Sequence, residues 1–288
     1  MIAVVVLTYD ARPGMLEACL AALREHSGSD VVVTLVDNGQ NARGLDASSR
    51  RGVEVVETGR NLGFAGGMNV GIRRALSAGA VAVFVMNDDV VVQPGWLEPL
   101  LAELDIDPRV GAVQPKLVFP DQPPTVNSLG VQLGRDGAGT DIAMGVLDSA
   151  ARTDAHDIEL FTGGAVLLRS AFLDDVGLFD ERFFMYYEDV DLGLRGHQRG
   201  WRYRCVPRST VVHEGGATVA RAGHSGAFHR ERNRVWILLR YRPAGDALRG
   251  LWLSVRRLRW RPRLVHARAL AAGLVAAPRL LLARRRQA

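Results

Sequence analysis

Acidic side chains that could hold a divalent ion follow an apolar run in the first half of the chain. The run Val81–Met86 is wholly apolar and is followed at once by Asn87, Asp88 and Asp89. Because a parallel sheet binds ligands at the carboxyl ends of its strands, adjacent acids there would lie in a crevice. Their oxygens suit Mg²⁺ or Mn²⁺, which would bridge to a diphosphate. A polar turn that ends a strand explains the same residues equally well.

A second acidic group stands at the start of a predicted helix. The aromatic-rich stretch Phe183–Tyr187 leads into Glu188, Asp189 and Asp191. Residues 189 and 191 would lie about 200° apart on a helix, so they cannot serve one site equally. Asp191 is spaced i,i+4 from Arg195 and could pair with it on the helix surface, which leaves Asp189 as the better candidate for a buried general base. The helix dipole favours acids at this position but does not explain the aromatic residues before them.

Two polar segments could meet a nucleotide. Asp37, Asn38 and Gly39 follow the apolar run Val31–Val36, where an acid could accept a hydrogen bond from a ribose hydroxyl or a base, or form an ordinary turn. The glycine-rich stretch Asn61–Gly71 leads into a predicted helix, so its backbone N–H groups could approach an anionic ligand closely.

Two weaker signals lie in the second half. His213 follows the short apolar run Thr210–Val212, although a lone histidine is more often structural than a metal ligand. Gly163 and Gly164 precede the apolar run Ala165–Leu168, where paired glycines allow either a close approach of a ligand or a tight turn.

The elements that must position these residues alternate between strand and helix patterns. Short valine-rich runs separated by helical periodicity predict an α/β domain whose mostly parallel sheet is covered by helices on both faces. The predicted strands are Ile2–Leu7, Val31–Val36, Val53–Glu57, Val81–Met86 and Val110–Val118, and the predicted helices are Pro13–His26, Gly66–Ala78 and Pro94–Leu104, with Pro13 and Pro94 as helix starters. Residues 119–160 are rich in Pro, Gly, Asp and Ser and predict a long loop region for an acceptor or a lid.

The last quarter of the chain differs in charge. The 288 residues carry a formal net charge of +5, but residues 1–232 hold 22 basic and 30 acidic side chains, and residues 233–288 hold 14 arginines against one acid, Asp246. We expect a main domain at 1–220 and an Arg-rich amphipathic helical region at 221–288. Within that region the predicted helical segments are Asn233–Arg242, Gly245–Arg259 and Leu264–Arg286. Its longest uncharged stretch is too short to cross a bilayer, which needs about 20 apolar residues.

Compartment signals are few. Two distant cysteines, Cys19 and Cys205, indicate neither a disulfide framework nor a thiolate metal site, and the first residues lack a basic flank typical of a signal peptide. These features favour a cytoplasmic protein.

Taken in order, six motifs closely resemble those of the family-2 glycosyltransferases, in particular the rhamnosyltransferase and galactofuranosyltransferase branch. The resemblance covers roughly residues 1–216. The motifs are Val5–Asp10, Val36–Gly39, Asn61–Phe64, Asn87–Asp89, Gly163-Gly164 and Tyr187–Leu192.

The resemblance implies a GT-A fold and an inverting transfer of sugar from a nucleoside diphosphate, dTDP-rhamnose-like or UDP-linked, to a hydroxyl of a glycan, lipid-linked or small-molecule acceptor. Asp89 and His213 would hold Mg²⁺ or Mn²⁺, Asp189 would be the general base with Glu188 in support, and Gly163 and Gly164 would face the acceptor. The implied nucleotide-sugar site comprises Thr8, Tyr9, Asp10, Asp37, Asn38, Asn61, Gly63, Phe64, Gly67, Asn87 and Asp88. In two places the chain departs from the family: Asp10 stands where relatives often carry Asn, and Asn87 where many carry an acid.

Other classes fit less well. A nicotinamide-dependent oxidoreductase would need glycines after the first strand, where Thr8–Pro13 stands instead. A non-catalytic nucleotide-sugar binder remains an alternative. The arginines of the tail alternate with Leu, Trp and Val, which favours an anionic membrane over nucleic acid, so we expect peripheral contact with the inner face of the cell membrane. The resemblance also implies an acceptor linked to a polyprenyl diphosphate, which would suit that position. Packing against the catalytic domain or a homodimer through these helices is the alternative.

Overall fold

The fold is described from a computed structural model, for residues 1–12, 14–39, 45–214, 217–259 and 262–285. Its strands are β1 (Ile2–Thr8), β2 (Val31–Asp37), β3 (Val53–Glu57), β4 (Ala82–Asn87), β5 (Val90–Val92), β6 (Val110–Phe119), β7 (Thr125–Ser128), β8 (Val131–Leu133), β9 (Gly139–Asp141), β10 (His156–Ile158), β11 (Ala165–Arg169) and β12 (Arg202–His213). Its helices are α1 (Met15–His26), α2 (Gly63–Ser77), α3 (Leu97–Asp105), α4 (Ser170–Val176), α5 (Glu188–His197), α6 (Ala217–Tyr241), α7 (Ala244–Arg257), α8 (Arg263–Val275) and α9 (Ala277–Arg285).

A mixed sheet forms the centre of the molecule. Its order over the described residues is β10-β12-β6-β11-β4-β1-β2-β3, with β5 paired to β12 and β7 to β6. Neighbours β4, β1, β2 and β3 run parallel, as do β6 and β12, whereas β11 runs antiparallel between β4 and β6. The sheet is therefore mixed and mostly parallel, as expected.

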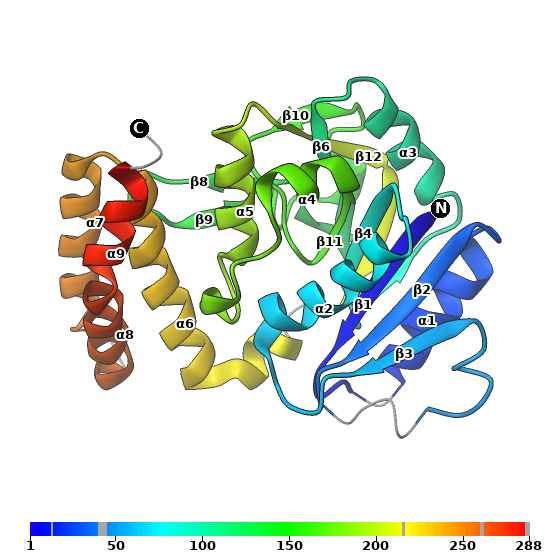
Figure 1. Ribbon diagram of the computed structural model, residues 1–288, viewed down its shortest axis with the longest axis horizontal. Helices are drawn as coiled ribbons and strands as arrows, with labels where there is room; N and C mark the ends of the chain where they lie inside the picture. Colours follow the sequence, from blue (N-terminus) through cyan, green and yellow to red (C-terminus); the bar gives the residue numbers. More distant parts are fainter. Residues whose placement is uncertain (13, 40–44, 215–216, 260–261, 286–288) are drawn as a thin grey trace.

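Helices cover both faces of this sheet, so the central strands are buried on both sides (Figure 1). On one face, α1 and α3 pack against alternate residues of β1, β2 and β4, and Leu16, Leu20 and Leu23 recur there at helical spacing. On the other face lie α2, α4 and α5. Burial on both faces explains why the strands are continuous apolar runs.

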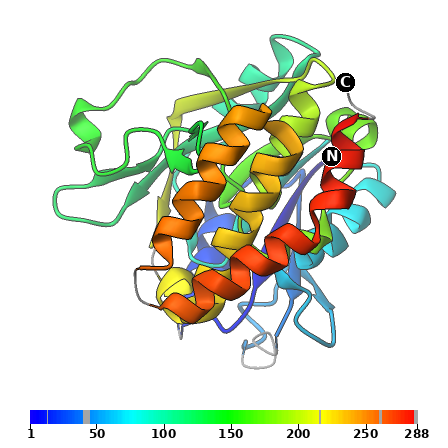
Figure 2. The ribbon, with the colours of Figure 1, turned by 90° about the vertical axis from the view of Figure 1, so that its left-hand side faces the viewer.

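The C-terminal helices stand at the opposite side of the molecule from β3 (Figure 1), with α7, α8 and α9 packed around α6 (Figure 2). A third apolar cluster joins α6 to the rest of the fold: Val235 and Ile237 of α6 lie with Val190 of α5 and Val131 of β8. Helix α6 runs across residue 220, and the division into domains at 220/221 stays a prediction. Within the described residues, no helix is both long and apolar enough to cross a membrane.

Three expectations about elements were wrong. Residues 119–160 are not a long loop, because they contain β7, β8, β9 and β10. The third predicted helix begins at Leu97 rather than Pro94, which lies in a turn. The segment predicted as one helix, Leu264–Arg286, is two helices, α8 and α9, and its final residue lies outside the described residues. Pro13, the predicted start of the first helix, also lies outside them.

Candidate active site

The proposed metal ligands Asp89 and His213 lie together at one edge of the sheet. Asp89 is in the turn between β4 and β5, and His213 ends β12 beside Val90 of β5. The Nε2 atom of His213 is 3.3 Å from Oδ1 of Asp89. That oxygen is buried and has no hydrogen-bond partner among the described residues. A buried, unpartnered carboxylate oxygen facing an imidazole nitrogen is the arrangement that a bound cation would complete.

A neighbouring amide orients the histidine for this role. Nδ1 of His213 lies 2.8 Å from Oδ1 of the buried Asn127, on β7. Because an amide oxygen only accepts, Nδ1 must carry the hydrogen, and in the neutral ring the lone pair is then on Nε2, facing Asp89. Metal-binding histidines characteristically donate their other N–H in this way. Asn127 stands in the stretch predicted as loop, and nothing in the sequence distinguished it.

The donor set is small: one hard carboxylate oxygen and one imidazole nitrogen. Within the described residues, no cluster of three or more His, Cys, Asp or Glu side chains suits a metal. One carboxylate and one imidazole leave most positions of a six-coordinate ion to water and phosphate oxygens, as is usual for Mg²⁺ at nucleotide sites. The residues present therefore fit Mg²⁺ or Mn²⁺ bound together with a diphosphate.

The two other members of the motif have different surroundings. Oδ2 of Asp88 accepts a 2.6 Å hydrogen bond from the buried hydroxyl of Thr8, at the end of β1. Asn87 ends β4, and its backbone N–H donates to the carbonyl of Gly164. Behind them, burial and the charges of Asp88 and Asp89 raise the pKa of the Cys19 thiol, so it stays neutral. Asp89, rather than Asp88, has the unpartnered oxygen.

The paired glycines join the metal motif to the general-base candidate. While the Gly164 carbonyl accepts from Asn87, the backbone N–H of Gly163 donates to Oδ2 of Asp189 at 2.8 Å. A Cβ on Gly163 would lie 3.3 Å from the Phe64 ring and 3.4 Å from Asp189, so only glycine fits there without displacement. The structure thus brings Phe64, the glycine pair, Asn87 and Asp189 together.

Asp189 stands in the first turn of α5 with its carboxylate held by the backbone. Its Oδ1 accepts from the N–H of Val190 at 2.8 Å. Burial raises the pKa of Asp189, and the nearby charge of Asp141 adds to this, while the bonds from Gly163 and Val190 act in the opposite direction. A fixed carboxylate with a raised pKa is suited to accept a proton.

Glu188 is more deeply buried. Burial, then the charges of Asp189 and Asp191, raise the pKa of Glu188 well above its ordinary value. Its Oε2 has no hydrogen-bond partner among the described residues. A neutral Glu188 would spare Asp189 a second negative charge at the start of α5.

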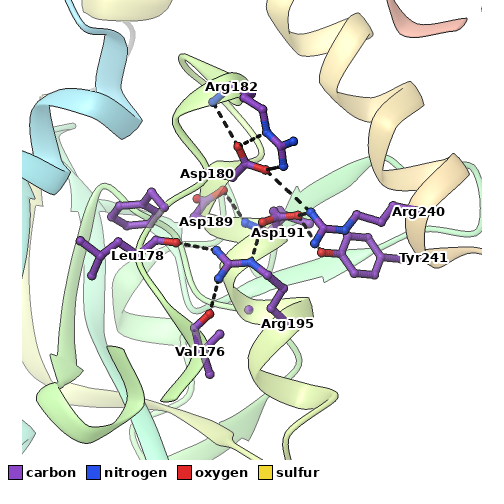
Figure 3. Close-up of polar contacts among 12 residues, drawn as sticks. Val176, Leu178, Asp180, Arg182, Asp189, Asp191, Arg195, Arg240 and Tyr241 are labelled. Atoms are coloured by element: carbon purple, nitrogen blue, oxygen red, sulfur yellow. Dashed lines mark hydrogen bonds and ion pairs between the residues drawn. The ribbon is translucent and has the colours of Figure 1, made fainter. Parts of the chain in front are cut away.

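Asp191 does not face the site. It pairs with Arg195 at 2.8 Å, as the i,i+4 spacing predicted, but its carboxylate is fully buried and the guanidinium is partly buried, so the pair does not lie on the helix surface. Arg240 and Tyr241 of α6 bond its other oxygen and cover it (Figure 3).

The residues predicted to bind the nucleotide fall into two groups, one exposed and one buried. Tyr9 and Asp10 are exposed at the end of β1, whereas Asp37 is buried and accepts from the N–H of Gly39. The amide of Asn38 is fully engaged: it donates to Asn61 and to the Gly63 carbonyl, and it accepts from Leu62 and Thr58.

Three further residues predicted to bind the nucleotide have structural contacts: Asn61, Gly63 and Gly67. Asn61 accepts from the N–H of Gly63 at 2.8 Å, and a Cβ on Gly63 would collide with Phe184. Gly67 allows α2 to approach Leu7 of β1 closely. Direct contact of these residues with a nucleotide stays a prediction.

A further carboxyl enters the site from β9. Asp141 carries a pKa raised by burial, with a hydrogen bond from Ser128 and the nearby His213 acting in the opposite direction. The charge of Asp141 also raises the pKa of Asp189, so Asp141 is close enough to act electrostatically on both the proposed metal ligand His213 and the proposed base. It too belongs to the stretch predicted as loop, where no motif marked it.

Comparison with known proteins gives a consistent result. A family model described as "Glycosyltransferase like family 2" matches residues 1–237. The N-acetylglucosaminyl-diphospho-decaprenol L-rhamnosyltransferase of Mycobacterium tuberculosis is 31% identical over 84% of this chain and 85% of its own length. The dTDP-rhamnosyl transferase RfbF of Shigella flexneri is 25% identical over 73% of this chain and 67% of its own.

Among solved structures, GalNAc-T7 with UDP, GalNAc and Mn²⁺ superimposes with a TM-score of 0.62. The identity is 15%, and the match covers 82% of this chain and 47% of that one. The likeness confirms the GT-A fold.

Proposed function

Because this chain belongs to the glycosyltransferase-like family 2, we propose that it moves a rhamnose-like sugar from a nucleoside diphosphate to a hydroxyl of a lipid-linked acceptor. Sugar transfer is the activity of its family. The donor, the acceptor, the inverting course and the roles of single residues are our proposals.

One observation carries the assignment of the site. The Asp89–His213 pair, with its unpartnered oxygen, and the Asp189 carboxylate belong to one connected group of residues, linked through Asn87 and the glycine pair. A transferase needs a group that holds the leaving diphosphate on one side of the anomeric carbon and a base for the incoming hydroxyl on the other. The Asp89–His213 pair would supply the first and Asp189 the second.

The step itself is a single displacement. Asp189 accepts the proton of the acceptor hydroxyl as its oxygen forms a bond to the anomeric carbon, and the bond from that carbon to the diphosphate oxygen breaks. The electron pair leaves with the nucleoside diphosphate, and the configuration at the anomeric carbon inverts. The base is held in position before the step, because Gly163 and Val190 fix both of its oxygens.

Asp89 and His213 would hold Mg²⁺ or Mn²⁺. When bound, the ion would neutralise charge that develops on the departing diphosphate. Asn127 keeps the Nε2 lone pair of His213 directed at that position, and Thr8 orients Asp88 beside it.

The proposed roles can be separated by two variants. Asp189→Asn should abolish transfer while donor binding persists, and Asp89→Ala should weaken metal-dependent donor binding. Turnover is followed by mass spectrometry of the product, and donor binding by calorimetry with and without Mn²⁺. Unchanged turnover in Asp189→Asn would refute the base assignment. Donor binding without turnover on any acceptor would favour a non-catalytic binder.

The names of the relatives support the choice of sugar and acceptor. One is a dTDP-rhamnosyl transferase, and the other acts on a diphospho-decaprenol acceptor. A thermal-shift screen with dTDP- and UDP-sugars and either metal tests the donor, because a ligand that binds the folded state raises its apparent stability. A shift with UDP-sugars alone would exclude the dTDP-linked donor.

We also propose that the C-terminal helices rest on an anionic membrane. On α7, the exposed fractions of Leu248, Trp252 and Val255 are 68%, 57% and 52%, and these residues recur at i, i+4 and i+7 on one helix face. Arg256 lies 4.8 Å over the Trp252 ring, and Arg249 is exposed alongside. Apolar side chains flanked by arginines are typical of helices lying in the headgroup region.

Flotation with vesicles tests this contact. The full chain should bind vesicles that contain phosphatidylglycerol and bind pure phosphatidylcholine weakly. The double variant L248S/W252S should lose this binding, whereas Ile106→Ser, at an exposed apolar residue in another part of the fold, should retain it. Equal vesicle binding by L248S/W252S and Ile106→Ser would refute the membrane contact. A lower sedimentation coefficient for L248S/W252S alone would indicate that this helix face forms a homodimer instead.

A further inference from the structure

The turn that precedes the proposed base has an unfavourable backbone. Phe184, Tyr186 and Tyr187 have φ values of +66°, +66° and +69°, in the left-handed region that non-glycine residues rarely adopt. Such conformations persist only where surrounding contacts enforce them, and they are found preferentially at functional sites. Glu188 and Asp189 follow directly, so the backbone of this turn decides where α5 begins.

Two neighbouring side chains of α6 contact this turn. Nη2 of Arg232 donates to the carbonyl of Phe183, and Asn233 makes the larger set of bonds. Nδ2 of Asn233 lies 3.0, 2.9 and 2.7 Å from the carbonyl oxygens of Phe183, Met185 and Tyr186. Asn233 is fully buried, and its two N–H bonds are shared among these three acceptors. Nε of Arg232 donates to Oδ1 of Asn233 at 2.8 Å, which fixes the orientation of the amide.

The same helix also holds the segment after the base. Nη1 of Arg240 and the hydroxyl of Tyr241 donate to Oδ1 of Asp191 at 2.8 and 2.6 Å, and Arg195 occupies the other oxygen (Figure 3). Asp191 is completely buried, and Arg240 of α6 adds a second cation to Arg195, which pairs with it from its own helix. Helix α6 therefore contacts the chain on both sides of Asp189.

We propose that Asn233 is a positioning residue for Asp189. By fixing the turn at 183–187, it sets the start of α5 and with it the position of the Asp189 carboxylate against the Gly163 N–H. Asn233 itself touches no substrate. The inference rests on the proposed role of Asp189 as the base, and it makes the Arg-rich C-terminal region part of the catalytic apparatus.

The test compares Asn233→Leu with a control on the neighbouring helix α7, which packs on α6. Asn233→Leu keeps the size of the side chain and removes all three bonds. Its kcat should fall about 10- to 100-fold, the effect of displacing a reacting group by a fraction of an ångström to one ångström, while the KM for the donor stays unchanged. Because the Gly163 bond lowers the pKa of Asp189, its loss should also move the acid limb of the pH–rate profile to higher pH.

The control is Ser254→Ala on α7, which removes a buried partner of Arg234 and makes no contact with the turn. It should lower the melting temperature yet keep the kcat and the pH profile of the wild type. Should Asn233→Leu fail to fold, Asn233→Ser, whose single hydroxyl can replace at most one of the three bonds, should also lower kcat with an unchanged donor KM.

The inference is overturned if a folded Asn233→Leu, or Asn233→Ser in its place, keeps the wild-type kcat and pH profile. It is also overturned if the Ser254→Ala control loses as much kcat. Asp189→Asn separates this from the proposed function: if that variant is inactive while Asn233→Leu is normal, only the positioning role fails. If Asp189→Asn is active, the base assignment fails and the inference with it.

Discussion

Replacing Asn127 with leucine should weaken Mn²⁺ binding although Asn127 would not touch the ion. The amide oxygen accepts the Nδ1 hydrogen of His213 and so keeps the Nε2 lone pair directed at Asp89. Leucine has a similar volume but no acceptor, so the imidazole would be free to change tautomer or rotate.

The size of the effect follows from this one contact. A neutral hydrogen bond contributes about 1 kcal/mol, which corresponds to about a fivefold change in affinity. Loss of the fixed tautomer adds to this, and removal of such an outer partner commonly costs about 10- to 100-fold in metal affinity. We therefore expect a loss near the lower end of that range for Asn127→Leu.

Free Mn²⁺ can be measured by electron paramagnetic resonance in the presence of a saturating nucleoside diphosphate. Asn127→Asp keeps an acceptor and should bind Mn²⁺ about as well as the wild type. Ser209→Ala removes a buried hydroxyl of β12, four residues from His213, and serves as the control for strand stability.

Wild-type Mn²⁺ affinity in a folded Asn127→Leu would refute the tautomer argument. An equal loss in Ser209→Ala would attribute the effect to the strand instead of the imidazole.

Three further predictions concern pH and backbone geometry. Because only the carboxylate can accept a proton and burial raises the pKa of Asp189, kcat should rise with pH through an apparent pKa above the ordinary value of about 3.9; a profile without this limb would contradict it. Burial alone would raise the pKa of Glu231, but the hydrogen bond and charge of Arg234 lower that pKa to about 2. The stability that ionised Glu231 gives the fold is therefore complete above about pH 4.5 and is lost as the pH falls towards 2. Glu231→Gln should accordingly lower the urea midpoint at pH 7 and do so much less at pH 3, and an equal effect at both would contradict the linkage. Gly63→Ala should destabilise the fold by more than about 1 kcal/mol in urea, since a Cβ there adds a collision with Phe184 to a positive φ, whereas Gly59→Ala, with the same φ and open space, should cost less.

The long strands of the sheet could be predicted because they are buried on both faces and so form continuous apolar runs. The predicted Val53–Glu57 coincides with β3, and Ile2–Leu7 and Val31–Val36 differ from β1 and β2 by one residue. The strands of three or four residues between 125 and 158 could not be found, because hydrophobic periodicity cannot be recognised over so few residues.

The candidate site was predictable where its residues follow long strands. Asp89 and His213 end apolar runs, and the sheet order brings β5 and β12 together. Asn127 and Asp141 lie on short strands with polar neighbours, and only the fold brings them near His213. Likewise, the i,i+4 rule predicted the pair of Asp191 with Arg195, but the burial of that pair depends on a helix about 50 residues further along the chain.

The contact between Asn233 and the turn at 183–187 has a consequence for the order of events during synthesis. The two partners are about 50 residues apart, so the proposed base segment leaves the ribosome well before the helix that holds it. Chains fold from the N-terminus as they emerge. We expect the nascent sheet to bind a nucleotide before it can transfer a sugar, and activity to begin only when α6 has been released and has docked.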